Sequence, residues 1–373
     1  MTEITLYGTP LSIYAGRPRS YLIKTRRPYR ETTPITKYYY EDVLPRAGGR
    51  QSVPTIETAD GEVIRDGAAI IDHYENATGN QWSPTTPKQR IISRLFDVIG
   101  AEGLLRPAFH YRWDFPAENM AFLLFHFETM VWRVPDRAKK AQKIADGASR
   151  GAKSFGAVPE NFELIETLYL ELLEKLDAHF SDYPYLLGVK PCIGDFGMMA
   201  PFYGHLGRDP KPLSLMQSQA IRLFRWVERM NRPEPDVGEF EVQDDAYLSN
   251  DEVPDSLLNV LRHIAIDFVP ETQAAATYIN EWIAQQPQLV PGTVAERGVG
   301  QCTFTVRATT ISALAQPYRF YLLQRVHDEY EALDKVARGE VDAMLEACDM
   351  TPILSTRLTR LIGRDNNLEV WAD

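Results

Sequence analysis

The chain has 373 residues, enough for two domains or more, and its 44% hydrophobic and 24% charged content is ordinary for a globular protein. The formal net charge of −11 argues against general nucleic-acid binding, because proteins that bind phosphate backbones present a cationic face. No run approaches the ~20 apolar residues of a membrane-spanning helix, so we expect no membrane partner.

The first 80 residues alternate between β-favouring and helical patterns. The expected order is strand, helix, strand, hairpin and helix, over residues 4–7, 16–23, 36–40, 53–64 and 68–77. Asp60-Gly61 is a strong two-residue hairpin signal. Pro54 stands at the head of a strand, and an X-Pro bond is one of the few that can be cis. The hairpin and the helix after it are the most informative part of the sequence.

A linker over residues 79–87 predicts a boundary between a domain over 1–79 and a mostly helical domain over 88–373. Helix-compatible patterns of sufficient length cover 89–105, 117–132, 161–180, 196–206 and 214–230, followed by an acidic connection over 236–255. Beyond it, the sequence predicts helices over 256–268, 272–285, 317–336 and 341–348, with a strand over 302–309.

The segment Tyr183-Pro-Tyr-Leu-Leu-Gly188 precedes Cys192-Ile-Gly-Asp195, which has the spacing of a capping box. Two side chains of such a box satisfy free N–H groups at a helix start. Cys192 stands where a hydroxyl residue is usual, so we expect a weaker cap with a structural role.

Together these motifs resemble those of the cytosolic glutathione transferases, over roughly residues 1–235. The resemblance implies a thioredoxin-like α/β domain followed by an enlarged, mostly all-α C-terminal domain with an extension from about residue 255. It also implies that Val53 and a cis-Pro54 hold the cysteinyl backbone of glutathione. An acid-plus-hydroxyl pair grips the γ-glutamyl end in this family, and here that pair reads Asp66-Gly67. Gly67 lacks the hydroxyl, and only its N–H can donate.

In serine-type members, similar to the theta and zeta classes, the loop after the first strand presents the residue that activates the thiol. Ser12 falls on that serine, five residues before Arg17, and Tyr14 is a second hydroxyl. Taken alone, a loop serine is more often a turn residue. Lowering a thiol pKa by ~2 units takes roughly 2.7 kcal/mol. One hydrogen bond to a charged group supplies ~1.5–3 kcal/mol, and a helix N-terminus ~0.3–1. Arg17 belongs to a basic stretch over residues 17–30, which is either a solvated helix face or a local attraction for an anionic ligand at a helix N-terminus, or both.

Aromatic residues of the helical domain are candidates for the second-substrate pocket, or equally for the core between helices. They are Phe109, Tyr111, Trp113, Phe202 and Tyr203. Aromatics at the second-substrate position would suit a hydrophobic electrophile.

The leading hypothesis is therefore a glutathione-dependent transferase, lyase or isomerase that acts on a small hydrophobic electrophile. The alternative is a non-catalytic binding or scaffold protein that keeps the fold without glutathione turnover. Seven histidines show no metal-ligand spacing, so we expect no metal site. No signal peptide is visible and the three cysteines form no Cys-x-x-Cys pair, so we expect a cytoplasmic protein. The resemblance also implies a homodimer.

Overall fold

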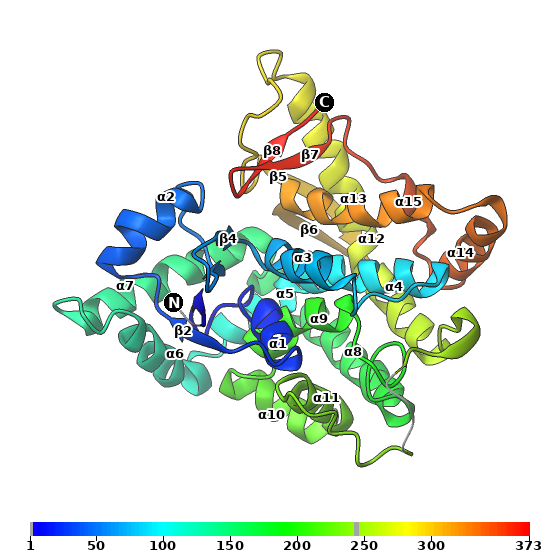
Figure 1. The fold of residues 1–373 in the computed structure, drawn as a ribbon, viewed down its shortest axis with the longest axis horizontal. Coiled ribbons are helices and arrows are strands. Elements are labelled where there is room, and N and C mark those ends of the chain that lie inside the picture. The colour runs from blue at the N-terminus through cyan, green and yellow to red at the C-terminus, as the bar shows by residue number, and fades with distance from the viewer. Residues whose placement is uncertain (1–2, 242–245) are drawn as a thin grey trace.

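The computed structural model describes residues 3–241 and 246–373. It begins with a four-stranded sheet, and helices make up most of the remainder (Figure 1). The elements of the first domain are β1 (Ile4–Tyr7), α1 (Gly16–Lys24), β2 (Tyr29–Thr32), β3 (Thr55–Glu57), β4 (Val63–Arg65) and α3 (Gly67–Thr78). The strand order is β2-β1-β3-β4, with β1 parallel to β2 and antiparallel to β3. This confirms the predicted thioredoxin-like domain.

The prediction of a strand over residues 36–40 is wrong. That stretch is helical and leads into the π-helix η1 (Tyr39–Val43) and α2 (Leu44–Arg46). Tyr39 and Val43, four residues apart, bury one helical face against Tyr7 and Val63 of the sheet. The second strand is instead β2, whose residues are polar and partly exposed, so its sequence lacks a hydrophobic alternation.

The predicted hairpin is present as β3 and β4, which pair antiparallel with Ile56 opposite Ile64. Gly61 has a φ of +92° in the connecting turn, a conformation that favours glycine. The Val53–Pro54 peptide bond is cis, as the resemblance implies.

The helical domain follows the linker. Its elements are α4 (Pro87–Val98), the π-helix η2 (Ile99–Gly103), α5 (Leu105–Trp113), α6 (Pro116–Met130), α7 (Arg137–Ala152), η3 (Lys153–Phe155), η4 (Pro159–Asn161), α8 (Phe162–Asp182), α9 (Ile193–Gly204), α10 (Pro210–Gln219) and α11 (Ile221–Met230). The predicted helix over 214–230 is divided into α10 and α11. Helix α7 was not predicted, because only alanines such as Ala141 and Ala145 form its buried face.

The capping box at the start of α9 is confirmed. One carboxylate oxygen of Asp195 accepts a hydrogen bond from the Cys192 N–H at 2.9 Å. The other accepts from the Leu186 N–H at 3.2 Å and from the indole N–H of Trp226 at 2.9 Å. Asp195 therefore joins the start of α9 to the preceding loop and to α11, which is a structural role.

The acidic connection over 236–255 contacts the helices through its acidic side chains. Glu239 forms an ion pair with the buried Arg229, and Asp251 accepts hydrogen bonds from the N–H groups of Lys88 and Gln89 at the start of α4. Asp244 and Asp245 lie outside the described residues. Glu239 and Asp251 are thus partners of an arginine and of a helix start.

The extension contains both helices and hairpins. Its elements are η5 (Ser249–Asp251), α12 (Asp255–Ala284), β5 (Gln301–Val306), β6 (Thr309–Leu314), α13 (Pro317–Glu331), α14 (Lys335–Ala347), α15 (Thr351–Ser355), β7 (Ile362–Asp365) and β8 (Leu368–Trp371). The predicted break between 268 and 272 is wrong, because α12 continues through Pro270 and buries one face along its length. Strand β5 was predicted, whereas β6, β7 and β8 were not.

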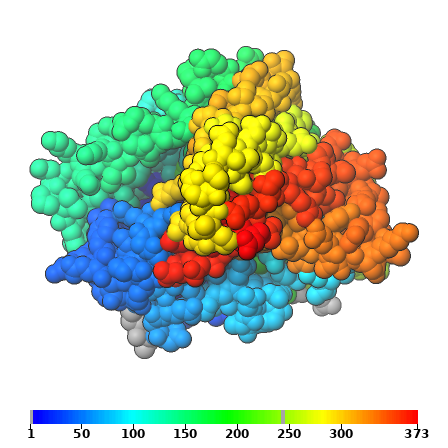
Figure 2. All heavy atoms as spheres, turned by 90° about the horizontal axis from the view of Figure 1, so that it is seen from above, coloured from blue at the N-terminus to red at the C-terminus, as the bar shows by residue number. Residues whose placement is uncertain are grey.

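The extension folds back onto the first domain, and Figure 2 shows the C-terminal residues in red against the N-terminal residues in blue. The side chain of Asn367, between β7 and β8, accepts from the Arg65 N–H of β4 at 3.1 Å and donates to the Val63 carbonyl at 2.9 Å. On α13, Arg325 pairs with Asp72 of α3, and Glu329 pairs with Arg90 of α4. The extension therefore joins the two predicted domains. In the described ranges, no helix combines the length and the apolar character needed to cross a bilayer.

Candidate active site

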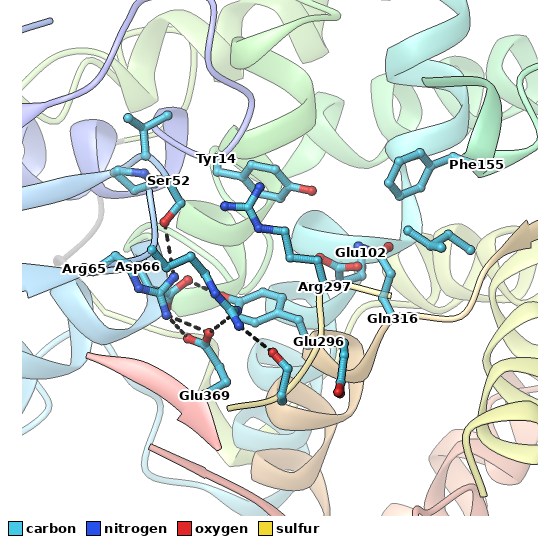
Figure 3. A pocket seen from close by; sticks show the side chains of 16 residues that line it. Tyr14, Ser52, Arg65, Asp66, Glu102, Phe155, Glu296, Arg297, Gln316 and Glu369 are labelled. Carbon is cyan, nitrogen blue, oxygen red and sulfur yellow. Dashed lines mark hydrogen bonds and ion pairs between the residues drawn. The ribbon is translucent and has the colours of Figure 1, made fainter. Parts of the chain in front are cut away.

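A cavity of about 460 Å³ lies where the first domain, the helical domain and the extension meet (Figure 3). The first domain contributes Tyr14, Arg50, Ser52, Val53, Pro54, Arg65 and Asp66, and the helical domain contributes Glu102 and Phe155. The extension contributes Ala295, Glu296, Arg297, Leu314, Gln316, Tyr318 and Glu369. Its volume is in the range of small-molecule sites, and both apolar and charged groups line it.

Four residues predicted for the site line this cavity: Tyr14, Val53, Pro54 and Asp66. The Pro54 carbonyl accepts a hydrogen bond from the Asp66 N–H at 3.0 Å, which places the cis bond next to the acid. Asp66 has a φ of +87°, rare for a residue with a Cβ, and such strain is common at functional sites. The residues that the sequence singled out thus form the part of the cavity wall around the cis peptide bond.

Both oxygens of the Asp66 carboxylate accept hydrogen bonds from this chain. Oδ1 accepts from the N–H groups of Ala68 and Ala69 at 3.0 and 3.1 Å, so Asp66 caps α3. Oδ2 accepts from the Tyr318 hydroxyl at 2.6 Å. Burial raises the pKa of Asp66, but nearby arginines, mainly Arg364 and Arg65, and the Tyr318 bond outweigh it and hold the pKa below its usual value. Asp66 is therefore a fixed negative charge in the cavity wall.

The two candidate hydroxyls differ in position. The Ser12 oxygen accepts a hydrogen bond from the Ala15 N–H at 3.2 Å, the turn geometry expected of a loop serine, and Ser12 is not among the residues that line the cavity. The Tyr14 ring lines the cavity, and Figure 3 shows its hydroxyl directed toward Phe155. Burial and the Glu102 carboxyl raise the pKa of Tyr14 well above its usual value, so this hydroxyl keeps its proton and can donate.

Arg17 and Gly67 lie behind the cavity wall. The Arg17 guanidinium forms a buried ion pair with Asp97 of α4, and Arg17 does not line the cavity. Gly67 opens α3, and a Cβ added to it would lie 3.4 to 3.5 Å from Pro18, Tyr14 and Arg17, which is ordinary contact. A larger residue than glycine therefore fits at position 67.

The five candidate aromatics are not gathered in the cavity. Tyr111 is buried against Tyr169, Trp113 stacks on Phe127, and Phe202 packs edge-on against Trp226. Tyr203 accepts a hydrogen bond from Arg208 at 3.3 Å on another face. Phe109 packs against Phe155, which does line the cavity. The packing is that of a core between helices. Of the five aromatics, only Phe109 has a ring contact with a residue that lines the cavity.

Sequence reasoning missed the residues that close the cavity. The Arg50 guanidinium donates to the Ala295 carbonyl at 2.6 Å, and Arg297 donates to the Gln51 carbonyl at 2.6 Å. The extension segment 295–297 thus crosses the loop before the cis bond. Glu102 of η2 was missed as well, although the stretch Gly100-Ala101-Glu102-Gly103 places two glycines beside a carboxyl group in a helical pattern. Among the described residues, no group of three potential metal ligands gathers.

Comparison with known proteins is consistent with this architecture. Residues 6–82 match the family described as glutathione S-transferase, N-terminal domain. The first part of this chain is glutathione S-transferase-like. A comparison with curated proteins finds no match.

Solved structures, among them glutathione S-transferases, align with this chain at low identity and low TM-score. One from Methylobacterium radiotolerans, in complex with glutathione sulfonate, is 14% identical, with a TM-score of 0.37 over 63% of this chain and 92% of that chain. One from Rhodospirillum rubrum is 16% identical, with a TM-score of 0.38 over 69% and 99%. A beta-etherase from Sphingobium is 18% identical, with a TM-score of 0.38 over 62% and 95%. At these values the likeness does not indicate a substrate.

Proposed function

We propose that the cavity binds glutathione and that the protein transfers or adds its thiol to a small hydrophobic electrophile. The observation that carries the proposal is that one cavity brings together cis-Pro54, Asp66 and the Tyr14 hydroxyl. The first two lie within residues 6–82, the glutathione S-transferase-like part of the chain, and the resemblance of the motifs implies that they hold glutathione. The Tyr14 hydroxyl keeps its proton and can donate a hydrogen bond to the glutathione thiolate.

Tyr14 is the better supported thiolate donor, because it lines the cavity and Ser12 does not. A thiolate near the Tyr14 hydroxyl would gain one hydrogen bond to a charged group, worth ~1.5–3 kcal/mol. That gain alone is enough to lower a thiol pKa by about one to two units. The earlier assignment of this role to Ser12 stays a prediction, and single substitutions distinguish the two.

A second function is favoured by one observation, the Tyr318–Asp66 hydrogen bond. The acid that would hold the γ-glutamyl end is already bound by the extension of the same chain. A carboxylate oxygen can accept more than one hydrogen bond, so glutathione can share Asp66 with Tyr318. If it does not, the cavity is a binding site for another small molecule, without thiol chemistry.

Calorimetry with glutathione and with glutathione sulfonate, followed by turnover of 1-chloro-2,4-dinitrobenzene, tests the proposal. Saturable binding of both compounds with turnover is the expected result. Binding without turnover would support the non-catalytic alternative. If neither the wild type nor Asp66→Asn binds glutathione, that result would contradict any glutathione site in this cavity. Asp60→Asn, in the exposed turn between β3 and β4 and away from the cavity, is the matched control and should bind like wild type.

A further inference from the structure

Glu102 is a buried carboxyl group at the cavity. It is 2% exposed, its side chain lines the cavity, and its Oε2 has no hydrogen-bond partner in the described part of the chain. Figure 3 places it beside Arg297 and Gln316. A buried polar atom without a partner costs free energy, and such atoms call for an explanation. The cavity offers one, since a ligand bound there would meet this carboxyl.

The backbone around Glu102 is held in place. Glu102 lies on the π-helix η2, a type of helix often found at functional sites. Gly100 of the same helix approaches Gly197 of α9 so closely that an added Cβ would lie 2.3 Å from its backbone. The Arg319 guanidinium donates to the Glu102 carbonyl at 3.0 Å. Glu102 is therefore positioned by its backbone.

Among residues 3–241 and 246–373, no cation forms an ion pair with the Glu102 carboxyl. Arg319 pairs with Glu271 at 3.0 Å and bonds the Thr272 hydroxyl at 2.8 Å, and Arg17 pairs with Asp97. The charges that act on Glu102 from the surrounding elements are those of Arg319, Glu271, Asp66 and Arg17, and Tyr14 and Arg297 line the same cavity. Burial raises the pKa of Glu102 to about 8, against the lowering effect of Arg319. Most of the carboxyl is thus protonated at neutral pH.

We propose that Glu102 is a catalytic proton donor in this cavity, acting on electrophiles that gather negative charge on oxygen when a thiolate attacks them, with epoxides as the representative class. The inference rests on the proposed function, because it needs glutathione as the nucleophile. A positioned general acid contributes typically 10²- to 10⁴-fold in rate.

The proposed step is balanced without any further reagent. The glutathione thiolate forms a C–S bond to one epoxide carbon, and the C–O bond at that carbon breaks. The electron pair stays on oxygen, which takes the proton from Glu102. The resulting Glu102 carboxylate then takes a proton from solvent. The thiol of the next glutathione molecule releases its proton to solvent, so the two transfers balance. The products are a hydroxy thioether and the enzyme in its starting state.

Two probes separate this role from thiolate formation. Styrene oxide needs a proton on its leaving oxygen, whereas 1-chloro-2,4-dinitrobenzene expels chloride and needs none. We therefore use the ratio of kcat/KM for styrene oxide to kcat/KM for 1-chloro-2,4-dinitrobenzene. In this ratio, any pH dependence from ionisation of the glutathione thiol cancels. For the wild type, we expect this ratio to be constant below pH 7 and to fall up to about ten-fold per pH unit above the Glu102 pKa of about 8. This measurement needs no variant.

Glu102→Gln should lower the ratio of kcat/KM for styrene oxide to kcat/KM for 1-chloro-2,4-dinitrobenzene by about 10²- to 10⁴-fold, whatever its effect on the chloride probe alone. It should also abolish the pH dependence of the ratio. Glu296→Gln is the matched control: it lines the same cavity but accepts a hydrogen bond from the Trp371 indole, so the ratio should not change. Turnover of the chloride probe with a pH-independent wild-type ratio would overturn the role of Glu102 alone. No turnover of either probe would overturn the proposed function as well.

Discussion

At the scale of single residues, two hydroxyls in one loop compete for one role, and only Tyr14 reaches the cavity. Tyr14→Phe should lower kcat for 1-chloro-2,4-dinitrobenzene by roughly 10- to 100-fold, because it removes a hydrogen bond worth ~1.5–3 kcal/mol to the thiolate. Ser12→Ala should retain most turnover. A pH titration of thiolate absorbance in each complex checks the cause. The opposite pattern, loss with Ser12→Ala alone, would restore the sequence-based assignment.

Gly67 is the one departure from the glutathione-binding pair, and the structure has room to repair it. Contacts of 3.4 to 3.5 Å around an added Cβ are ordinary, so Gly67→Ser should be accommodated. We expect glutathione to bind about five-fold more tightly, since a new hydrogen bond gains about 1 kcal/mol. Calorimetry measures this directly. Gly67→Ala is the control for size, and equal affinity of the two variants would show that the hydroxyl makes no bond.

Burial of Glu102 also predicts a pH dependence of stability. Its pKa is raised from 4.5 to about 8 in the folded protein, so between these values the folded state binds more protons than the unfolded state. Stability is therefore lost as pH rises through this window, by up to about 1.4 kcal/mol per pH unit from this group. Urea unfolding of wild type and Glu102→Gln at pH 5.5 and 7.5 tests it. The variant should become relatively more stable at the higher pH, and a constant difference would contradict the shift.

At the scale of elements, the β7–β8 hairpin is held to β4 by a buried ion pair. The Arg65 guanidinium donates to both Glu369 oxygens at 2.6 Å, and the two side chains are 7% and 5% exposed. Glu369→Ala should reduce the free energy of unfolding by about 3–5 kcal/mol, because it leaves a buried charge without its partner.

Denaturant unfolding provides the measurement for Glu369→Ala. The exposed pair Arg357–Glu331 gives a matched control, and Glu331→Ala should cost no more than about 1 kcal/mol. If both substitutions have the same small effect, the hairpin does not depend on the buried pair. Replacing Arg65 and Glu369 together by apolar residues should recover part of the loss.

Elements with a local signal were predictable and those fixed by distant contacts were not. The β3–β4 hairpin has its Asp-Gly turn, and α9 has its capping box, so both follow from short stretches of sequence. Residues 36–40 have β-favouring side chains but fold as helix, because Tyr39 and Val43 pack on the sheet. Strand β7 has only four residues and pairs with an equally short β8, which leaves too few positions for a period-2 pattern.

The cavity residues likewise divide into those with a local sequence signal and those brought in by distant contacts. Val53, Pro54 and Asp66 lie within one motif of the sequence, and all three line the cavity at one point. Arg297 and Tyr318 reach that point from the extension, more than 200 residues away, and no local pattern marks them. The aromatic candidates pack mostly between helices, because aromatics at helical spacing serve the core as well as a pocket, and periodicity does not separate these uses.

At the scale of the whole molecule, the extension occupies the surface between α3 and α4. Arg325 and Glu329 of α13 pair with Asp72 of α3 and Arg90 of α4. The resemblance implies a homodimer in which the first domain of one subunit meets the helical domain of the other. Candidates for that interface are the aromatics around Trp82 and the helix predicted over 89–105, although either could equally be core. Here α13 of the same chain covers that helix, so we expect the extension to take the place of a partner subunit.

Light scattering at micromolar concentration should therefore give a mass near the 42.4 kDa of one chain. A mass of twice that value would confirm the homodimer that the resemblance implies, and would place its interface away from α13.

Arg325→Glu together with Glu329→Arg reverses both charge pairs and would repel α13 from α3 and α4. If the extension substitutes for a partner, this variant should lose stability, shown by a lower urea midpoint, and gain a tendency to dimerise. An unchanged midpoint and mass would indicate that α13 is held by its apolar contacts, such as Phe320 and Leu323, independently of these ion pairs.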